Sequence, residues 1–332
     1  MDASLSELLT GETVGGYLAA RGIPARDAAE PLAGGVSNVV LAVRAQDGRE
    51  LVVKQSLERL RVAAEWHAPK RRILSEAAGL ATLRSLDADA APAVVDVDPE
   101  RMVLVLERAP EGAEDWKAAL LRGEADPVVA ARLGRIVGLM HRETAGRPLP
   151  ALLEDDPEAF EALRLDPYHG EVARRLPGLA ARVREVADGI RATRVCLVHG
   201  DLSPKNVLVL PDGRVWLIDF EVAHRGDPVF DLAFLLSHLV LKAMRRPEAA
   251  ERYVDAADAF LAAYRESRGA IPPDAELLPQ LACLLLARVV GKSPVDYLDS
   301  AQRDAVLAIG TRLLGGAPPS LAALLDQLRR LS

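Results

Sequence analysis

Residues 197–221 read LVHGDLSPKNVLVLPDGRVWLIDFE, in which two apolar runs lie on either side of a Pro-Asp-Gly turn. This pattern is typical of two strands joined by a tight loop. Asp201 and Asn206 precede the first apolar run, and Asp219 ends the second. A hairpin of this kind can bring the three side chains to one edge of the sheet. Two carboxylates and an amide there predict an all-oxygen site for a hard cation such as Mg²⁺, which takes few protein ligands besides water and substrate phosphates.

Each of these three residues also has a structural interpretation when it is taken alone, because Asp201 and Asn206 could cap turns and Asp219 could end a strand. Their order in the chain adds information. His199-Gly200-Asp201, followed by Asn206 and Asp219, resembles the catalytic loop and metal-binding motif of eukaryotic-like kinases. The form His-Gly-Asp, in place of His-Arg-Asp, resembles the aminoglycoside phosphotransferase and choline kinase-like family of small-molecule kinases. This resemblance implies that Asp201 is the catalytic base and that Asn206 and Asp219 hold magnesium.

The composition is that of a large globular chain. It has 332 residues, of which 50% are apolar and 27% are charged, so two lobes are expected. No apolar run reaches the roughly 18 residues that a membrane-spanning helix needs. The segment Met1-Asp2-Ala3-Ser4 also lacks the basic start of a targeting signal. We therefore expect a cytoplasmic enzyme with no membrane partner.

The charge and the cysteine content narrow the class further. The net charge of −7 argues against nucleic acid as a partner, because phosphate backbones are bound by clustered cations. The two cysteines, Cys196 and Cys283, have no CxxC spacing. We expect buried thiols at both positions, with neither a disulfide nor a metal site. None of these features indicates the oligomeric state.

The first hundred residues predict short helices followed by a small sheet. Residues 4–22 carry apolar positions at helical spacing and end in Arg21-Gly22, as a helix followed by glycine would. Residues 32–54 then predict three strands separated by a glycine pair and by a Gln-Asp-Gly turn. Lys54 ends the third of these strands.

The glycine pair and Lys54 are similar to the phosphate-covering loop and the ATP-contacting lysine of the same kinase superfamily. The similarity implies that the backbone amides of Gly35, Ser37 and Asn38 face the phosphates of ATP. Ordinary hairpin glycines are the alternative, and the loop lacks the complete GxGxxG pattern of protein kinases.

A helix over residues 69–85 follows, and it offers a partner for Lys54. Its apolar positions recur at helical spacing, and the resemblance implies that Glu76 pairs with the lysine. A solvated helical glutamate is the alternative. The segment between them, with Glu65-Trp66, is partly similar to methylthioribose kinases, which makes a methylthioribose-like sugar the first candidate acceptor.

An apolar strand at residues 101–110 leads into a Pro and Gly break. In the family that the chain resembles, the matching strand leads into the hinge between the lobes, where backbone groups bind adenine. The resemblance therefore implies that the backbone of Glu107 and Ala109 contacts the nucleotide.

Helical periodicity dominates the rest of the chain. The predicted fold class is α+β, with a bilobal protein-kinase-like fold in which residues 1–109 form a small antiparallel sheet lobe and residues 110–332 a large helical lobe. The small lobe is expected to hold five strands, the N-terminal helices, the glycine loop and the helix with Glu76. The helices expected in the large lobe cover residues 114–122, 127–144, 157–163, 170–192, 228–244, 247–268, 275–291 and 299–330.

Several polar residues of the large lobe have a structural and a functional interpretation. Asp227 or Asp231 could cap the helix that follows, and the resemblance implies that Asp231 braces the catalytic loop. Arg288 and Lys292 lie near a helix end, where cations complement the helix dipole or could contact substrate or phosphate. The acidic group 154–158 could be solvated or could attract a cationic substrate. Glu221 stands where protein kinases have glycine, and it is a further substrate or structural candidate.

Together these features predict an ATP- and Mg²⁺-dependent kinase for a hydroxyl of a small molecule. The alternative acceptors are an aminoglycoside, a macrolide and an amino alcohol such as choline. A protein kinase is disfavoured, because only eleven residues separate Asp219 from Asp231 and no long activation segment follows. A nucleotide-binding module without catalysis is disfavoured because Lys54, Asp201, Asn206 and Asp219 are all chemically intact.

Overall fold

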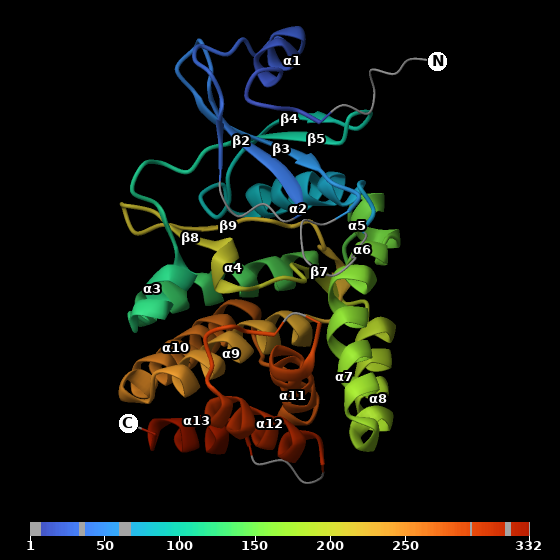
Figure 1. Cartoon of the computed structure of the whole chain (residues 1–332), viewed down its shortest axis with the longest axis vertical. Helices are drawn as coiled ribbons and strands as arrows, with labels where there is room; N and C mark the ends of the chain where they lie inside the picture. Colours follow the sequence, from blue (N-terminus) through green and yellow to red (C-terminus); the bar gives the residue numbers. More distant parts are fainter. Residues whose placement is uncertain (1–7, 33–36, 60–67, 293, 316–319, 332) are drawn as a thin grey trace.

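The computed structural model describes residues 8–32, 37–59, 68–292, 294–315 and 320–331. Gly35 and the Glu65-Trp66 pair lie outside the described residues. A five-stranded antiparallel sheet forms the upper part of Figure 1, with its strands in the order β1-β2-β3-β5-β4. The strands are β1 (Glu30–Pro31), β2 (Asn38–Arg44), β3 (Glu50–Ser56), β4 (Val94–Asp98) and β5 (Val103–Glu107).

This sheet is covered on both faces by helices. In β5, Val103 and Val105 pack in the cluster that contains residues of α1 (Val14–Ala20), whereas Leu104 and Leu106 pack in the cluster that contains residues of α2 (Arg72–Leu86). Successive side chains of a strand point to opposite faces, so the valines of β5 pack on one face of the sheet and the leucines on the other. The central strands are therefore fixed on two sides, and β3 holds Lys54 opposite Val40 and Leu104.

Helices form the lower part of the molecule (Figure 1). They are α3 (Trp116–Arg122), α4 (Pro127–Thr144), α5 (Ala151–Asp155), α6 (Glu158–Phe160), α7 (Glu171–Arg175), α8 (Ala180–Ala192), α9 (Pro228–Arg245), α10 (Ala250–Arg268), α11 (Asp274–Val290), α12 (Ser300–Leu314) and α13 (Leu321–Arg329). A π-helix, Glu161–Gly170, connects α6 to α7.

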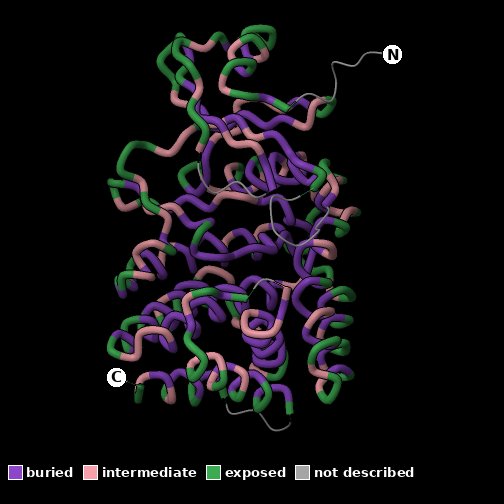
Figure 2. Tube along the Cα trace, in the orientation of Figure 1, coloured by how far each residue is buried: buried purple, intermediate pink, exposed green. Residues whose placement is uncertain are grey.

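The centre of this lobe is apolar, and Figure 2 shows its inner segments buried. Nearly every residue of α9 is buried, and Asp227 caps its first turn by accepting a hydrogen bond from the backbone of Val229 at 2.9 Å. Helices α4 and α10 cross closely at Gly134, where an added Cβ would lie 2.3 Å from the carbonyl oxygen of Phe260. A larger residue at Gly134 would therefore separate the two helices.

Short strands lie between the two lobes. β6 (Glu114–Asp115), β8 (Val207–Val209) and β9 (Val215–Leu217) form one sheet in the order β6-β8-β9, and β7 (Cys196–Val198) pairs with β10 (His224–Gly226) in another. The hairpin predicted from the Pro-Asp-Gly turn is β8-β9. β8 and β9 run antiparallel to each other, so the residues before β8 lie close to the residues after β9.

The predicted fold class is confirmed, but some helix boundaries were wrong. The helix expected over 170–192 is broken at Leu176–Leu179, next to Pro177, into α7 and α8. The one expected over 299–330 is two helices, α12 and α13. The segment expected as a helix over 157–163 is a single turn that continues into the π-helix.

The cysteines and the membrane prediction can also be compared with the structure. Cys196 and Cys283 are buried free thiols, as expected. Within the described ranges, no helix combines the length and the apolar character that crossing a bilayer requires.

Candidate active site

The loop between β7 and β8 carries Asp201 and is held by Asp231 at the start of α9. The carboxylate of Asp231 accepts hydrogen bonds from the backbone N–H of His199 at 2.7 Å and of Gly200 at 2.8 Å. Asp231 is fully buried, and its Oδ2, which accepts from the His199 N–H, also lies 3.1 Å from His141 Nε2. Burial opposes the charge of Asp231, but His141 and the backbone donors hold the pKa of its carboxyl below the usual value. Asp231 therefore acts as an ionised anchor for the loop.

Gly200 gives this loop its direction. Its φ is +75°, a left-handed conformation that side chains rarely adopt, and an added Cβ would lie 2.8 Å from the carbonyl oxygen of Val222. His199 fixes the same turn, because its Nδ1 accepts a hydrogen bond from the backbone N–H of Asp201 and its Nε2 donates to the carbonyl of Ile218. The side chain of Asp201 is aimed by backbone geometry and by two neighbours.

The carboxylate of Asp201 is 3% exposed and is surrounded by donors. Its Oδ2 lies 2.7 Å from the guanidinium of Arg164, 3.2 Å from the Lys205 ammonium and 2.9 Å from Asn206 Nδ2. Burial opposes ionisation, but the charges of Arg164 and Lys205 more than offset it and hold the pKa of Asp201 below its usual value. Asp201 is therefore ionised at neutral pH and can accept a hydrogen bond from a hydroxyl.

Lys54, Glu76 and Asp219 form a second charged group across the cleft. Lys54 Nζ lies 2.5 Å from Glu76 Oε1 and 2.9 Å from Asp219 Oδ1. Burial disfavours the ammonium of Lys54, but Asp219 and Glu76 more than compensate and hold its pKa above the usual value. For Glu76, which is fully buried, burial raises the pKa and Lys54 only partly offsets it. The helix after the lysine strand thus places Glu76 beside Lys54, where the family resemblance puts it.

Asp219 has an unusual backbone conformation for a non-glycine residue, with a φ of +69°. Such left-handed conformations are uncommon and are found at functional sites, although aspartate tolerates them better than most residues. Its carboxylate is kept ionised, since Lys54 and Lys205 offset the effect of burial and hold the pKa of Asp219 low. Asp219 therefore presents a charged oxygen ligand at the end of β9.

The donor set of Asn206 and Asp219 fits a hard cation. Asn206 Nδ2 donates to both the carbonyl oxygen and Oδ2 of Asp201, so the amide oxygen of Asn206 is the atom that a cation could contact. Among the described residues, no group of three or more His, Cys, Asp or Glu side chains could hold a metal. A cation at Asp219 and Asn206 would therefore take most of its ligands from water and substrate, as Mg²⁺ does.

Glu221 and Asn38 belong to a buried connection between the lobes. Glu221 Oε2 accepts from Arg72 Nε at 3.1 Å and from Asn38 Nδ2 at 3.4 Å. Arg72 is fully buried and also donates to the backbone carbonyls of Ser37 and Leu57. The carboxylate of Glu221 thus balances a buried guanidinium, and the geometry gives it a structural position.

A cavity of about 1480 Å³ lies between the two lobes. Lys54 and Glu76 line it at one end, and Glu107 and Ala109 line it where β5 ends. The backbone N–H of Glu107 already donates to the carbonyl of Ala93 at 2.9 Å. The N–H of Glu107 is therefore occupied. The carbonyl oxygen of Glu107 is the backbone atom left to accept a hydrogen bond, as from an adenine amino group.

Arg288 and Lys292 lie at the C-terminal end of α11. The Arg288 guanidinium lies 5.2 Å from the centre of the Tyr168 ring and 6.0 Å from that of Phe234. The backbone N–H of Lys292 donates to the carbonyl of Pro167 at 3.3 Å. Arg288 therefore points toward the π-helix and α9, and Lys292 is tied to the π-helix through its backbone.

The acidic group 154–158 is engaged with arginines. Asp156 and Glu158 each lie 2.5 Å from the Arg71 side chain, and Glu154 lies 2.6 Å from Arg225. Basic residues from distant segments therefore pair with three of these carboxylates, which neither of the two interpretations of this group had included. Their charges are already balanced within the chain.

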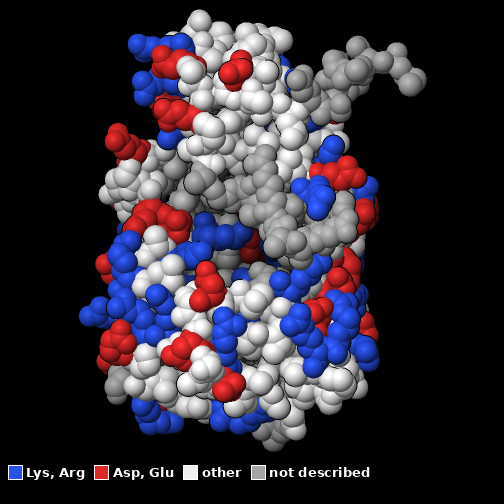
Figure 3. Space-filling view, viewed as in Figure 1, with Lys and Arg blue, Asp and Glu red and all other residues white. Residues whose placement is uncertain are grey.

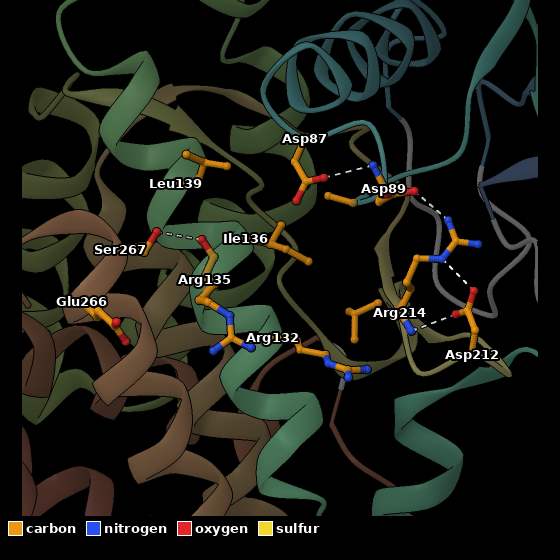
Figure 4. Close-up of a pocket in the computed structure, with 12 residues that line it drawn as sticks. Asp87, Asp89, Arg132, Arg135, Ile136, Leu139, Asp212, Arg214, Glu266 and Ser267 are labelled. Atoms are coloured by element: carbon orange, nitrogen blue, oxygen red, sulfur yellow. Dashed lines mark hydrogen bonds and ion pairs between the residues drawn. The ribbon is translucent and has the colours of Figure 1, made fainter.

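A second pocket, of about 670 Å³, lies beside the outer end of the β8-β9 hairpin (Figure 4). It is lined by side chains of α4 and of the turns at Asp89 and Asp212. Arg214 pairs there with Asp212 at 2.8 Å and with Asp89 at 2.7 Å. Lys54 and Lys205 do not line this pocket, whereas both line the cleft between the lobes.

Sequence reasoning missed two partners of Asp201. Lys205 lies directly before Asn206 in the motif, so its proximity could have been inferred. Arg164 comes from the π-helix, and no spacing in the sequence connects it with the catalytic loop. Only the fold brings its guanidinium to the carboxylate.

Comparisons with known proteins identify similar sequences and folds. A family model described as a phosphotransferase enzyme family matches residues 28–290. An uncharacterized protein of Deinococcus radiodurans is 33% identical over 111 residues, and the match covers 31% of this chain and 31% of that protein.

Solved structures with the same fold include several small-molecule kinases. An amicoumacin kinase in complex with AMP-PNP, Ca²⁺ and its ligand is 19% identical, with a TM-score of 0.56 and coverage of 90% of this chain and 91% of that one. A choline/ethanolamine kinase family protein of Mesorhizobium loti is 18% identical, with a TM-score of 0.54 and coverage of 96% and 99%. The macrolide 2'-phosphotransferase of Brachybacterium faecium is 19% identical, with a TM-score of 0.53 and coverage of 93% and 99%.

The bilobal fold is shared with these small-molecule kinases. Since the family model covers most of its length, the chain belongs to the phosphotransferase enzyme family.

Proposed function

We propose that the protein transfers the γ-phosphoryl group of ATP to a hydroxyl of a small molecule, in a reaction that requires Mg²⁺. The observation that carries this proposal is that Lys54 and Lys205, which both line the cleft between the lobes, pair with Asp219 and with Asp201, while Asp201 also accepts a hydrogen bond from Asn206. Lys54 is held between two carboxylates at 2.5 and 2.9 Å, and Asp201 stands on the other side of Asn206. The likeness to kinases named for macrolides, choline and amicoumacin supports a small acceptor.

Asp201 acts on the acceptor in this proposal. Its ionised carboxylate accepts a hydrogen bond from the hydroxyl and takes the proton as the oxygen attacks the γ-phosphorus. The bond between the γ-phosphorus and its bridging oxygen breaks, and ADP leaves with the electron pair. Arg164 and Lys205 hold the carboxylate in place and keep it ionised.

Lys54 acts on the nucleotide. Its ammonium would contact the α- and β-phosphates, and Glu76 fixes its position. Asp219 and Asn206 would hold Mg²⁺, which neutralises phosphate charge when it is bound. The backbone amides of Ser37 and Asn38, together with Gly35, are proposed to face the phosphates, and the Glu107 carbonyl and the Ala109 backbone to face the adenine. The division into lobes at residue 109 stays a prediction that accompanies this arrangement.

The acceptor class follows first from the partial likeness to methylthioribose kinases, which favours a sugar-like alcohol. Aminoglycosides, macrolides and amino alcohols are the alternatives. The pairing of Glu154, Asp156 and Glu158 with arginines removes one reason to favour a cationic acceptor.

The test is release of ADP from Mg-ATP with a panel of methylthioribose, other sugars, aminoglycosides, macrolides and amino alcohols. The control variant is Asp201→Asn, which keeps the shape of the side chain. We expect turnover with one acceptor class and a loss of about 100-fold or more in the variant, with ATP binding unchanged. Near-normal turnover by Asp201→Asn would contradict the assigned role of Asp201.

A further inference from the structure

A cluster of basic side chains lies on α9 and α11 next to the catalytic loop. The basic cluster consists of His238 and Lys242 on α9 and Arg288 on α11. His238 Nε2 lies 3.4 Å from Arg288 Nη2, and Lys242 lies one helical turn beyond His238. Lys242 Nζ lies 5.8 Å from the centre of the Tyr297 ring. In the space-filling view, basic side chains (blue) line the hollow at the middle of the molecule (Figure 3).

The basic cluster is connected to Asp201 through one aromatic ring. Arg164, which pairs with Asp201, lies 5.9 Å from the centre of the Phe234 ring, and Arg288 lies 6.0 Å from the same ring. Phe234 in turn lies 5.4 Å from His238, ring centre to ring centre. Since a helix rises about 1.5 Å per residue, Lys242 lies roughly 12 Å along α9 from Phe234. That distance suits a small molecule with a hydroxyl at one end and a second functional group at the other.

Lys242 is the member of the basic cluster that the fold itself leaves without an acid. Lys242 is 1% exposed, and no hydrogen bond or ion pair joins its ammonium to any residue that the structure describes. The Tyr297 side chain lies next to Lys242, and its hydroxyl is a buried polar atom that has no hydrogen-bond partner among the described residues. A buried ammonium without a counter-ion is costly, and so is an unsatisfied buried hydroxyl. Both costs would be relieved by one bound anion.

The charges around Lys242 also favour a bound anion. Burial, together with the neighbouring charges of Arg288, Lys117 and Arg245, lowers the pKa of Lys242 to about 7, while Asp115 acts in the opposite direction. His238 is likewise kept neutral by burial and by the charges of Lys242, Arg288, Lys205 and Lys117, which lower its pKa. The local field is therefore strongly positive, and a cationic acceptor group would be repelled from it.

We propose that the basic cluster binds an anionic group, a carboxylate or a phosphate ester, on the acceptor whose hydroxyl lies at Asp201. The planar guanidinium of Arg288 and the ammonium of Lys242 are suited to such groups, and Tyr297 can donate a further hydrogen bond. This inference rests on the proposed function, and it narrows the acceptor to hydroxylated anions. It sets neutral and cationic acceptors aside, so methylthioribose, which is neutral, is no longer the first candidate under this inference.

The test compares four compounds on one carbon skeleton: glucose, gluconate, glucose 6-phosphate and glucosamine. Binding is measured as the shift in melting temperature at matched ionic strength, without nucleotide, and turnover is measured separately as ADP release. The variants are Lys242→Met, Lys54→Met and the matched control Lys70→Met, whose lysine is exposed on the surface. Lys54→Met reports whether an anion occupies the nucleotide phosphate site instead.

We expect gluconate or glucose 6-phosphate to stabilise the wild-type protein, Lys54→Met and Lys70→Met, with at least a tenfold weaker affinity in Lys242→Met. Four outcomes would each overturn the proposal. The anions could stabilise Lys242→Met as much as the wild type, or the shift could be lost only in Lys54→Met. The shift could also occur only with glucose or glucosamine, or with no anion at all. Turnover of a cationic or neutral acceptor would overturn this inference and leave the kinase intact. Anion binding at Lys242 with no ADP release from any acceptor would support the site and count against the proposed transfer.

Discussion

The guanidinium of Arg164 lies 2.7 Å from the carboxylate of Asp201. It also donates from Nε to the carbonyl of Gly200 at 3.1 Å, so it holds the catalytic loop at its backbone and at its side chain. The arginine stands in a π-helix, a rare structure that is frequent at functional sites. Arg164 is thus a positioning residue that couples the π-helix to the proposed base.

Replacing Arg164 by methionine should separate catalysis from nucleotide binding. Asp201 would lose a buried partner, so we expect the free energy of unfolding to fall by about 3–5 kcal/mol. We expect kcat to fall by roughly 10- to 100-fold, because a small displacement of a catalytic group is costly, with little change in KM for ATP. Steady-state kinetics and urea unfolding measure both effects.

Two further variants distinguish positioning from general damage by Arg164→Met. Arg174→Met removes an exposed arginine that pairs with Glu171, and it should leave kcat unchanged. Arg164→Lys keeps the charge but loses the planar guanidinium that contacts Gly200 and Asp201 at once, and it should recover part of the activity. A folded Arg164→Met enzyme with normal kcat would show that Asp201 does not depend on this contact.

Asp231→Asn should destabilise the catalytic loop. The carboxylate accepts from the backbone N–H groups of His199 and Gly200, and an amide can accept from only one of them through oxygen. The other N–H would face a donor, so we expect a loss of about 1–3 kcal/mol and a marked loss of kcat. Thermal unfolding and ADP release test this, with Asp227→Asn as control because asparagine also caps helices well. Equal effects of the two substitutions would argue that Asp231 acts only on α9.

Local patterns explain why part of the site was predictable from the sequence. Asp201, Asn206 and Asp219 flank one hairpin, so a turn signal and two apolar runs suffice to place them together. Periodicity predicts the strand that ends in Lys54 and the helix that carries Glu76, the family resemblance implied that the two pair, and the structure brings them to 2.5 Å. Each of these relationships joins neighbouring elements, which sequence periodicity can describe. Their catalytic roles stay predictions.

The remaining features depend on contacts between distant elements. Arg164 reaches Asp201 from a π-helix that spans Glu161–Gly170, whereas the helix expected there ended at residue 163. Arg71 and Arg225 neutralise acidic residues that looked solvent-exposed in the sequence. Lys242 lies in a nearly all-buried helix, and nothing in its immediate sequence shows that it lacks an acidic partner. Such pairings are set by tertiary packing.

Gly200→Ala should impair the catalytic loop more than a usual glycine substitution. The residue has φ of +75°, and an added Cβ would lie 2.8 Å from the backbone of Val222. The left-handed conformation alone costs alanine about 1–2 kcal/mol, and the backbone contact adds to this. We expect a lower melting temperature and a large loss of kcat. Gly189→Ala is the control, since Gly189 is helical with no atoms near the added Cβ, and it should stabilise by up to about 1 kcal/mol. Similar results for both variants would show that Gly200 is not conformationally required.

Lys242→Met should stabilise the protein in a pH-dependent manner. The pKa of Lys242 is about 7 in the folded protein, against 10.5 for the ordinary value, so the native state binds fewer protons than the unfolded state between these two pH values. Wild-type stability should therefore rise with pH across that window, and below about pH 7 the native state carries the full cost of the buried charge. Methionine has a similar volume and no charge, so the variant should gain a few kcal/mol at pH 6, at ~1.4 kcal/mol per unit of pKa shift.

The gain from Lys242→Met should shrink as the pH approaches 10, because the lysine of the unfolded wild-type chain then also loses its proton and folding no longer has to remove it. Urea unfolding at a series of pH values measures this difference, and Lys70→Met, at an exposed lysine, should show no such dependence. A lysine that lowers stability without a ligand is consistent with a binding role, since a bound anion would restore its charge at neutral pH. A Lys242→Met variant that is less stable than wild type at pH 6 would mean that the ammonium is already compensated within the fold, and the argument for an anion beside it would fail.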